Sequence, residues 1–86
     1  MLKELELDTR ELEAPEPIDM VMNALSQLDN STYIKMIHRM EPKMLYINLD
    51  KNNLHYKARI QNETVYIYIW NDTFEKLSLL EDILCL

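Results

Sequence analysis

The sequence predicts an α+β fold: a two-layer α/β sandwich in which helices pack on a four-stranded mixed sheet, with an extra C-terminal helix. Three observations predict it. Apolar residues alternate with polar ones in four short segments, they recur at helical spacing in three others, and the order of the first six is β-α-β-α-β-β. The chain of 86 residues is enough for one hydrophobic core. We expect residues 1–70 to form the two-layer domain and residues 71–86 a helical extension.

The first half of the chain supplies a strand, a helix and a second strand. Residues 2–7 alternate around Leu5 and Leu7, which is typical of a half-buried strand. Residues 15–28 place apolar side chains on one face of a helix, namely Ile18, Val21, Met22, Leu25 and Leu28. Residues 33–40 alternate again, and one face of this strand should carry Ile34, Met36, His38 and Met40.

The second half supplies a helix and a hairpin. Pro42 suits a first helical position because its missing N–H needs no partner there, and Leu45 and Leu49 follow on one face. Residues 54–60 and 64–70 alternate on either side of a polar turn and predict a β-hairpin. The sheet face away from the helices would carry Lys57, Arg59, Tyr66, Tyr68 and Trp70. Such a face is too apolar to be left bare.

Residues 73–86 predict a third helix that covers an apolar surface. Their stripe consists of Phe74, Leu77, Leu80 and Leu84. Asp72 and Glu75 are spaced like a capping pair at the start of this helix. The helix either folds back over the aromatic sheet face of its own chain or packs on a second copy and makes a homodimer. The sequence leaves both alternatives open.

Glycine is absent from the chain, so another residue must supply the left-handed turns. We expect Asn30, Asn53 and Asn62 to do so, because asparagine tolerates positive φ and these three fall where elements should end. The same absence removes the glycine-rich loops that hold phosphates. A nucleotide-binding enzyme of the usual kinds is therefore not expected.

Charge and cysteine content narrow the class of protein further. The chain has 9 Lys and Arg residues against 15 Asp and Glu residues, so its net charge of -6 gives no overall attraction to nucleic acid or to an anionic membrane. The lone Cys85 cannot form an internal disulfide, and neither a signal peptide nor a membrane span is expected. We expect a cytoplasmic protein.

Two runs carry a resemblance to a known family. LDTRELEAPEPIDMVMNAL resembles the signature of the SirA/TusA-like sulfur-carrier superfamily, in which Leu-Asp, an Arg and then Cys-Pro-x-Pro open a helix after a strand. Ala14 stands at the cysteine position. The run IHRMEPKMLYINLDKNNLHYKARI is similar to a cysteine-less branch, a bacterial domain of unknown function. The resemblance covers residues 4 to about 70 and implies the same two-layer fold, from which the C-terminal helix departs.

In the sulfur carriers the cysteine thiolate lies at a helix N-terminus, where the helix dipole lowers its pKa. Ala14 has no nucleophile, so persulfide transfer at this position is excluded. Both prolines suit the first helical turn, and the glutamate between them suits the dipole. The vacant helix mouth would bind a small anion or a side chain of a partner protein. Its expected residues are Arg10, Pro15, Glu16, Pro17, His38 and Glu41.

The histidines and the cysteine are weaker candidates. A hydrogen-bonded structural role is favoured for His38 over a role as ligand or proton carrier, and His55 should be exposed or lie under the last helix. Cys85 lies within an apolar run and is better explained as a buried residue than as a reactive thiol. No metal-ligand spacing and no nucleophile-base order is present, so we expect no metal, cofactor or catalytic residue.

The leading hypothesis is a non-catalytic protein-interaction or small-ligand-binding module, and not an enzyme. A first alternative is a sulfur-transfer or redox protein that uses Cys85. A second is single-stranded nucleic-acid binding, with bases stacked on Tyr66, Tyr68 and Trp70. Phosphates would then meet Lys35, Lys57 and Arg59, but the last helix and the acidic net charge argue against this alternative.

Overall fold

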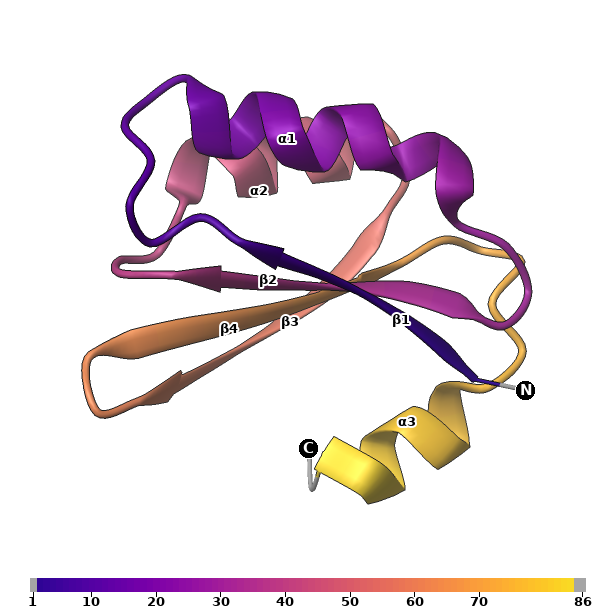
Figure 1. The fold of residues 1–86 in the computed structure, drawn as a ribbon. Coiled ribbons are helices and arrows are strands. Elements are labelled where there is room, and N and C mark those ends of the chain that lie inside the picture. The colour runs from indigo at the N-terminus through magenta and orange to yellow at the C-terminus, as the bar shows by residue number, and fades with distance from the viewer. Residues whose placement is uncertain (1, 85–86) are drawn as a thin grey trace.

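The computed structural model describes residues 2–84 and confirms the α+β class. A four-stranded mixed sheet carries two helices on one face and a third helix on the other (Figure 1). The elements are β1 (Lys3–Asp8), α1 (Glu16–Ala24), the short 3-10 helix η1 (Leu25–Gln27), β2 (Thr32–His38), α2 (Lys43–Lys51), β3 (His55–Gln61), β4 (Thr64–Trp70) and α3 (Leu77–Leu84). The predicted element order is confirmed.

The strands lie in the order β1-β2-β4-β3, with β1 parallel to β2 and the other neighbours antiparallel. The ladders place His38 opposite Val65, and Val65 opposite Ile60. This row lies at the C-terminal end of β2. Both α1 and α2 begin at the same end of the sheet (Figure 1). His38 therefore lies at the end of the sheet where both helices begin.

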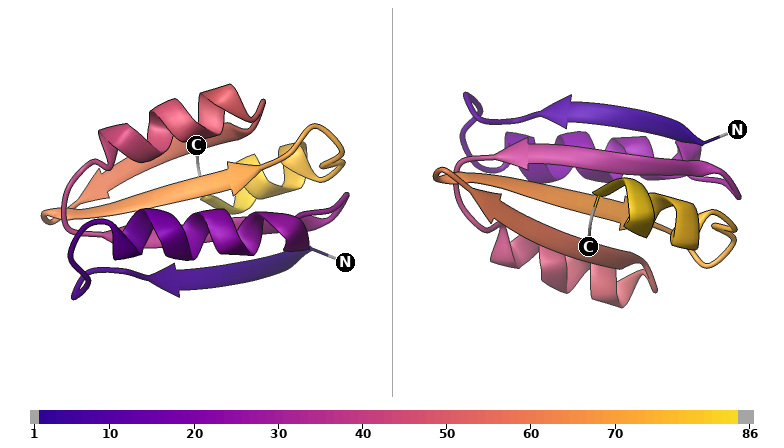
Figure 2. Two further views of the ribbon diagram at one scale, coloured as in Figure 1. Left: turned by 90° about the horizontal axis from the view of Figure 1, so that it is seen from above. Right: turned by 90° about the horizontal axis from the view of Figure 1, so that it is seen from below.

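The main core lies between the sheet and the helix pair α1 and α2 (Figure 2). Its fully buried side chains come from both layers: Val21, Ile34, Met36, Leu45, Leu49, Ile67 and Ile69. Each large apolar side chain in such a position contributes about 1.5–3 kcal/mol relative to an exposed one. The apolar faces that the sequence predicted for the two helices and for strands β2 and β4 therefore form this core.

The C-terminal segment packs on the opposite sheet face of its own chain. Phe74 and Leu80 form a second buried cluster with Tyr33 and Tyr68. Figure 2 shows α3 lying across that face, below the strands. Of the two sequence alternatives, the structure has the one in which the helix covers its own sheet. No helix among the described residues has the length and apolar character needed to cross a membrane.

The start of α3 differs from the expectation. The helix begins at Leu77, so Asp72 and Glu75 do not form a capping pair. The backbone N–H of Glu75 donates to the carbonyl of Asn30 at 2.7 Å, and Asp72 forms an ion pair with His55. These two contacts hold the segment before the helix in an irregular path.

Two further expectations about local structure were wrong in part. Strand β2 ends at His38, and Met40 is 59% exposed in the loop that follows. Positive φ occurs at Asn53, Asn62 and Glu63, but not at Asn30. Glu63 adopts it because the two-residue turn between β3 and β4 requires positive φ at both positions to match the twist of the strands.

Candidate functional site

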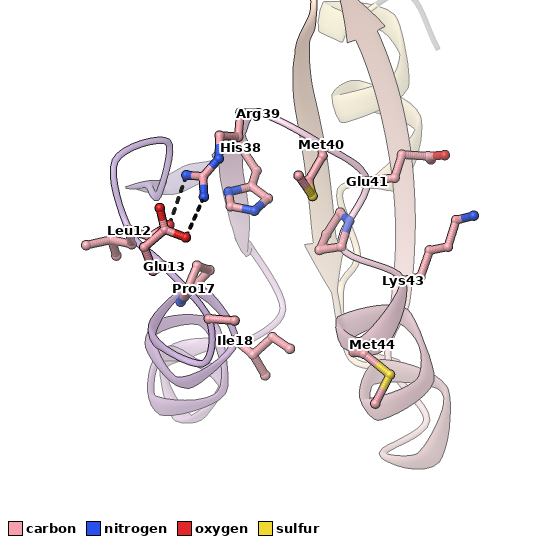
Figure 3. Close-up of a pocket in the computed structure, with 12 residues that line it drawn as sticks. Leu12, Glu13, Pro17, Ile18, His38, Arg39, Met40, Glu41, Lys43 and Met44 are labelled. Atoms are coloured by element: carbon pink, nitrogen blue, oxygen red, sulfur yellow. Dashed lines mark hydrogen bonds and ion pairs between the residues drawn. The ribbon is translucent and has the colours of Figure 1, made fainter.

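A groove of about 380 Å³ opens between the N-terminal ends of α1 and α2 (Figure 3). This volume lies at the low end of the range for small-molecule pockets, about 300–1,000 Å³. The lining is mainly apolar and includes Leu12, Ala14, Pro17, Ile18, Met40, Pro42 and Met44. The residues Met40 and Met44 are 59% and 63% exposed, so the groove presents apolar surface to its surroundings.

The buried polar group of this groove is the imidazole of His38, which is 7% exposed. The side chain of Thr9, which is fully buried, lies beside it just beyond β1. The Thr9 hydroxyl donates to the carbonyl of Ile37 at 2.8 Å, so its hydrogen is not available to His38. Nδ1 of His38 lies 3.0 Å from that hydroxyl oxygen and 3.2 Å from the Thr9 carbonyl oxygen. Nδ1 must therefore carry the proton and donate to Thr9.

The other ring nitrogen, Nε2, faces the groove (Figure 3). Burial lowers the pKa of His38, and the positive charge of Arg39 acts in the same direction. The ring is neutral at pH 7, so Nε2 holds a lone pair and accepts hydrogen bonds. None of the buried side-chain nitrogen and oxygen atoms in the described residues lacks a partner. Nε2 has none within the described protein, and the groove gives it contact with solvent.

Arg39 fastens the wall of the groove. Its Nη1 donates to the carbonyl oxygens of Arg10 at 2.6 Å and of Leu12 at 2.9 Å. Its Nη2 donates to Glu13 Oε2 at 3.1 Å (Figure 3). Guanidinium matches several acceptors at once because its donors are held in a rigid plane. These bonds connect the segment before α1 to the end of β2. Because Nη1 and Nη2 of Arg39 already bind protein acceptors, they are not free to bind a ligand.

The N-terminus of α1 has few donors for an anion. Pro15 and Pro17 have no N–H, and the N–H of Glu16 donates to the carbonyl of Glu13 at 3.0 Å. The peptide bond between Ala14 and Pro15 is cis. Glu16 and Asp19 add negative charge in the first turn. This helix end therefore differs from the usual anion site, in which several free N–H groups converge.

The structure brings together some of the expected site residues. Pro17, His38 and Glu41 line the groove. Pro15 and Glu16 lie in sequence between the lining residues Ala14 and Pro17 but do not line the groove themselves. Arg10 lines a separate hollow of about 570 Å³ with Asp8, Glu11 and Leu12. It donates to both carboxylate oxygens of Asp8, at 2.9 and 2.6 Å, and these bonds lower the pKa of Asp8 to about 2.

Three residues that matter here were missed by sequence reasoning: Thr9, Arg39 and Met44. Thr9 meets His38 because β1 is parallel to β2, with Asp8 opposite Ile37. This register is not readable from either strand alone. The sequence carried no clear signal, because Arg39 lies inside the alternating segment 33–40 and Thr9 lies in the predicted turn after residues 2–7.

The remaining candidates lie elsewhere. His55 is exposed and paired with Asp72, and its ring lies 6.2 Å from that of Trp70 in a shallow hollow near α3. Within residues 2–84 no three His, Cys, Asp or Glu side chains are grouped so that they could hold a metal ion. Cys85 lies outside the described residues.

The fold and the groove define an α+β domain with an apolar groove at the mouth of its first helix. No family model, no curated protein and no solved structure matches the chain. The resemblance to the SirA/TusA-like superfamily therefore rests on the two sequence runs alone.

Proposed function

We propose that the chain is a SirA/TusA-like domain without the carrier cysteine, a non-catalytic module whose groove receives an apolar side chain of a partner protein. The observation that carries this proposal is the groove itself, which is lined mainly by apolar side chains and flanked by the exposed Met40 and Met44. Exposed apolar surface beside a formed cavity is typical of interaction sites. A cytoplasmic location is part of the proposal.

A partner side chain is favoured over a small anion by the hydrogen-bond donors at the site. The guanidinium of Arg10 is engaged by Asp8, and that of Arg39 by the loop carbonyls and Glu13. The α1 N-terminus lacks the N–H groups of two prolines. Lys43 also lines the groove, but its ammonium group points away from His38 (Figure 3). An anion beside His38 would therefore lose its hydration and gain few hydrogen bonds.

A binding role is favoured over catalysis by the chemistry of the lining. Ala14 occupies the position of the carrier cysteine, and the lining contains no hydroxyl or thiol. Glu41 accepts a hydrogen bond from the Tyr46 hydroxyl at 3.3 Å, and Glu13 is paired with Arg39. The lining therefore lacks a hydroxyl or thiol nucleophile beside a base.

The other hypotheses receive less support. Nucleic-acid binding needs an open aromatic sheet face, yet Tyr68 is buried beneath the C-terminal segment, and Lys35 lies over the ring of Tyr66 and pairs with Glu6. Sulfur transfer would depend on Cys85. A homodimer through residues 73–86 would have to use the outer side of α3, where Leu79 is 48% exposed.

Affinity capture with matched methionine variants tests the proposal. Met44→Asp places a charge in the groove, and Met20→Asp places the same charge at an exposed position of α1 that does not line the groove. A partner protein should be retained from host-cell extract by the unmodified chain and by Met20→Asp, and lost with Met44→Asp. Equal retention by all three would show that the groove is not the binding site.

A further inference from the structure

Of the polar side chains that line the groove, only the imidazole of His38 is buried, while Glu13, Arg39, Glu41 and Lys43 are exposed. Nε2 of His38 holds a lone pair because Nδ1 donates to Thr9, and the ring cannot turn without losing that bond. Thr9 is itself held by its hydroxyl bond to the Ile37 carbonyl. The direction of the acceptor is therefore set by the pairing of β1 with β2, before any ligand binds.

An occupant that covers this acceptor must supply a donor. A purely aliphatic side chain would exclude water from Nε2 and offer nothing in exchange, and a buried polar atom without a partner weakens binding by roughly tenfold or more. The groove therefore favours apolar groups in general but disfavours leucine and other aliphatic side chains, because these would leave Nε2 without a donor.

A charged donor is disfavoured as well. Lysine or arginine would bring its charge into the apolar lining, where a cation needs a carboxylate partner. Glu13 is engaged by Arg39, and the carboxylate of Glu41 points away from His38 (Figure 3). The donor that fits should therefore be an uncharged N–H or O–H group carried by a large apolar body.

The methionines point to an aromatic body. Met40 and Met44 line the groove with flexible thioether side chains, which make favourable contacts with aromatic rings. Tryptophan and tyrosine combine such a ring with one polar hydrogen, and they are enriched at the centres of protein interfaces. Met40 extends the apolar surface beyond the base of the groove, so a protein surface covers more of it than a free small molecule would.

We propose that the groove is a receptor for a tryptophan or tyrosine side chain of a partner protein, whose ring lies against Met40 and Met44 and whose N–H or O–H donates to Nε2 of His38. This inference rests on the proposed function. It specifies the chemistry of the occupant at that site.

Two matched probes test it on the unmodified chain. Indole carries the ring and the N–H donor, whereas 1-methylindole carries the same ring without the donor. Titrations followed by NMR should show saturable shifts of the backbone amides of residues 38–44 with indole, and about tenfold weaker binding of 1-methylindole, equivalent to about 1.4 kcal/mol. The ¹⁵N resonance of His38 Nε2 should move with indole and stay in place with 1-methylindole.

The outcomes separate this inference from the proposed function. Equal affinity of the two probes would overturn the role of His38 and leave the binding groove standing. Failure of both probes, alongside loss of the partner in Met44→Asp, would overturn the aromatic occupant alone. A free aromatic compound released from the protein purified from its host, and detected by mass spectrometry, would overturn the assignment to a partner protein.

Discussion

The hydroxyl oxygen of Thr9 lies 3.0 Å from Nδ1 of His38, and the two residues are 29 positions apart in the chain. Their contact joins the end of β1 to the end of β2 beneath the groove. It decides which nitrogen of the imidazole carries the proton, and hence what the groove offers to a ligand. A bond between two strand ends thus determines the chemistry of a surface site.

Thr9→Val tests this contact, because valine has nearly the same shape but no hydroxyl. The Ile37 carbonyl would lose one donor and Nδ1 would keep only the Thr9 backbone carbonyl, so we expect a loss of about 1–2 kcal/mol in the free energy of unfolding. Urea unfolding measures the loss, and ¹⁵N NMR of the imidazole measures the tautomer. Thr73→Val removes a hydroxyl that donates to Asn71 at 2.7 Å but is exposed, so water can replace this bond and the loss should be less than about 1 kcal/mol.

The lowered pKa of His38 predicts a dependence of stability on pH. Because burial disfavours the charged ring in the folded state, the unfolded chain takes up this proton at higher pH than the folded one does. The free energy of unfolding should therefore fall as the pH drops below about 6.5, and the fall should end below the folded-state pKa. Asp8, with a pKa of about 2, titrates below this window.

Urea unfolding of His38→Gln from about pH 8 to about pH 5 measures this contribution. The slope below neutral pH should become flatter in the variant than in the unmodified chain. Gln61→Asn, at an exposed position without a titratable group, serves as the control and should keep the slope. An unchanged slope in His38→Gln would contradict the assignment.

Arg39→Lys tests the fastening of the groove wall. Lysine keeps the charge but cannot donate at once to two carbonyl oxygens and a carboxylate, so we expect a loss of about 1–2 kcal/mol and faster hydrogen exchange in residues 10–13. Mass-spectrometric hydrogen exchange measures the second effect. Arg10→Lys alters only an exposed pair with Asp8 and should cost less than about 1 kcal/mol. Equal exchange in the two variants would rule out a special role for Arg39.

The hairpin turn offers a stabilising substitution. Glu63 has φ of 65°, in the left-handed region where a Cβ atom is unfavourable. Glu63→Gly should raise the free energy of unfolding by about 0.5–1 kcal/mol, because Asn-Gly is a preferred sequence for this turn. Glu63→Ala keeps the Cβ and removes the carboxylate, so it should give no such gain. Thermal unfolding of both variants would reveal whether the conformation or the charge matters.

The docking of α3 on its own sheet can be measured with neighbouring leucines. Leu80 is fully buried, whereas Leu79 is 48% exposed. Leu80→Ala should cost about 2–4 kcal/mol, and Leu79→Ala less than about 0.5 kcal/mol. Fluorescence of Trp70, whose ring lies 6.5 Å from that of Phe74, should also shift in Leu80→Ala. Similar stabilities of the two variants would mean that the helix does not pack as described.

Much of the fold was predictable because it depends on local periodicity. The alternation in β2 and β4 and the helical spacing of Leu45 and Leu49 identified the elements and most of the buried side chains. The ends of elements were less predictable. Met40 continues the alternation of β2, but Arg39 turns to the loop before α1 and the strand stops at His38.

The location of the groove was predictable from the sequence, but only some of its lining residues were. The proline pair marked the helix mouth, and Pro17, His38 and Glu41 do line the groove. Arg10 was expected there, yet it pairs with Asp8 and lines a different hollow. Asp8, Glu11 and Glu13 all lie within three residues of Arg10 in the sequence. Which of these carboxylates pairs with Arg10 depends on the path of the folded loop.

The sequence by itself determined which segments are strands and helices and which of their faces are apolar, because side-chain periodicity is a property of the chain alone. Tertiary structure decided what those faces meet. It placed α3 on its own sheet, brought Thr9 to His38 through the parallel register of β1 and β2, and directed Nε2 into the groove. Each of these contacts joins residues far apart in sequence, so its formation depends on how the whole core packs.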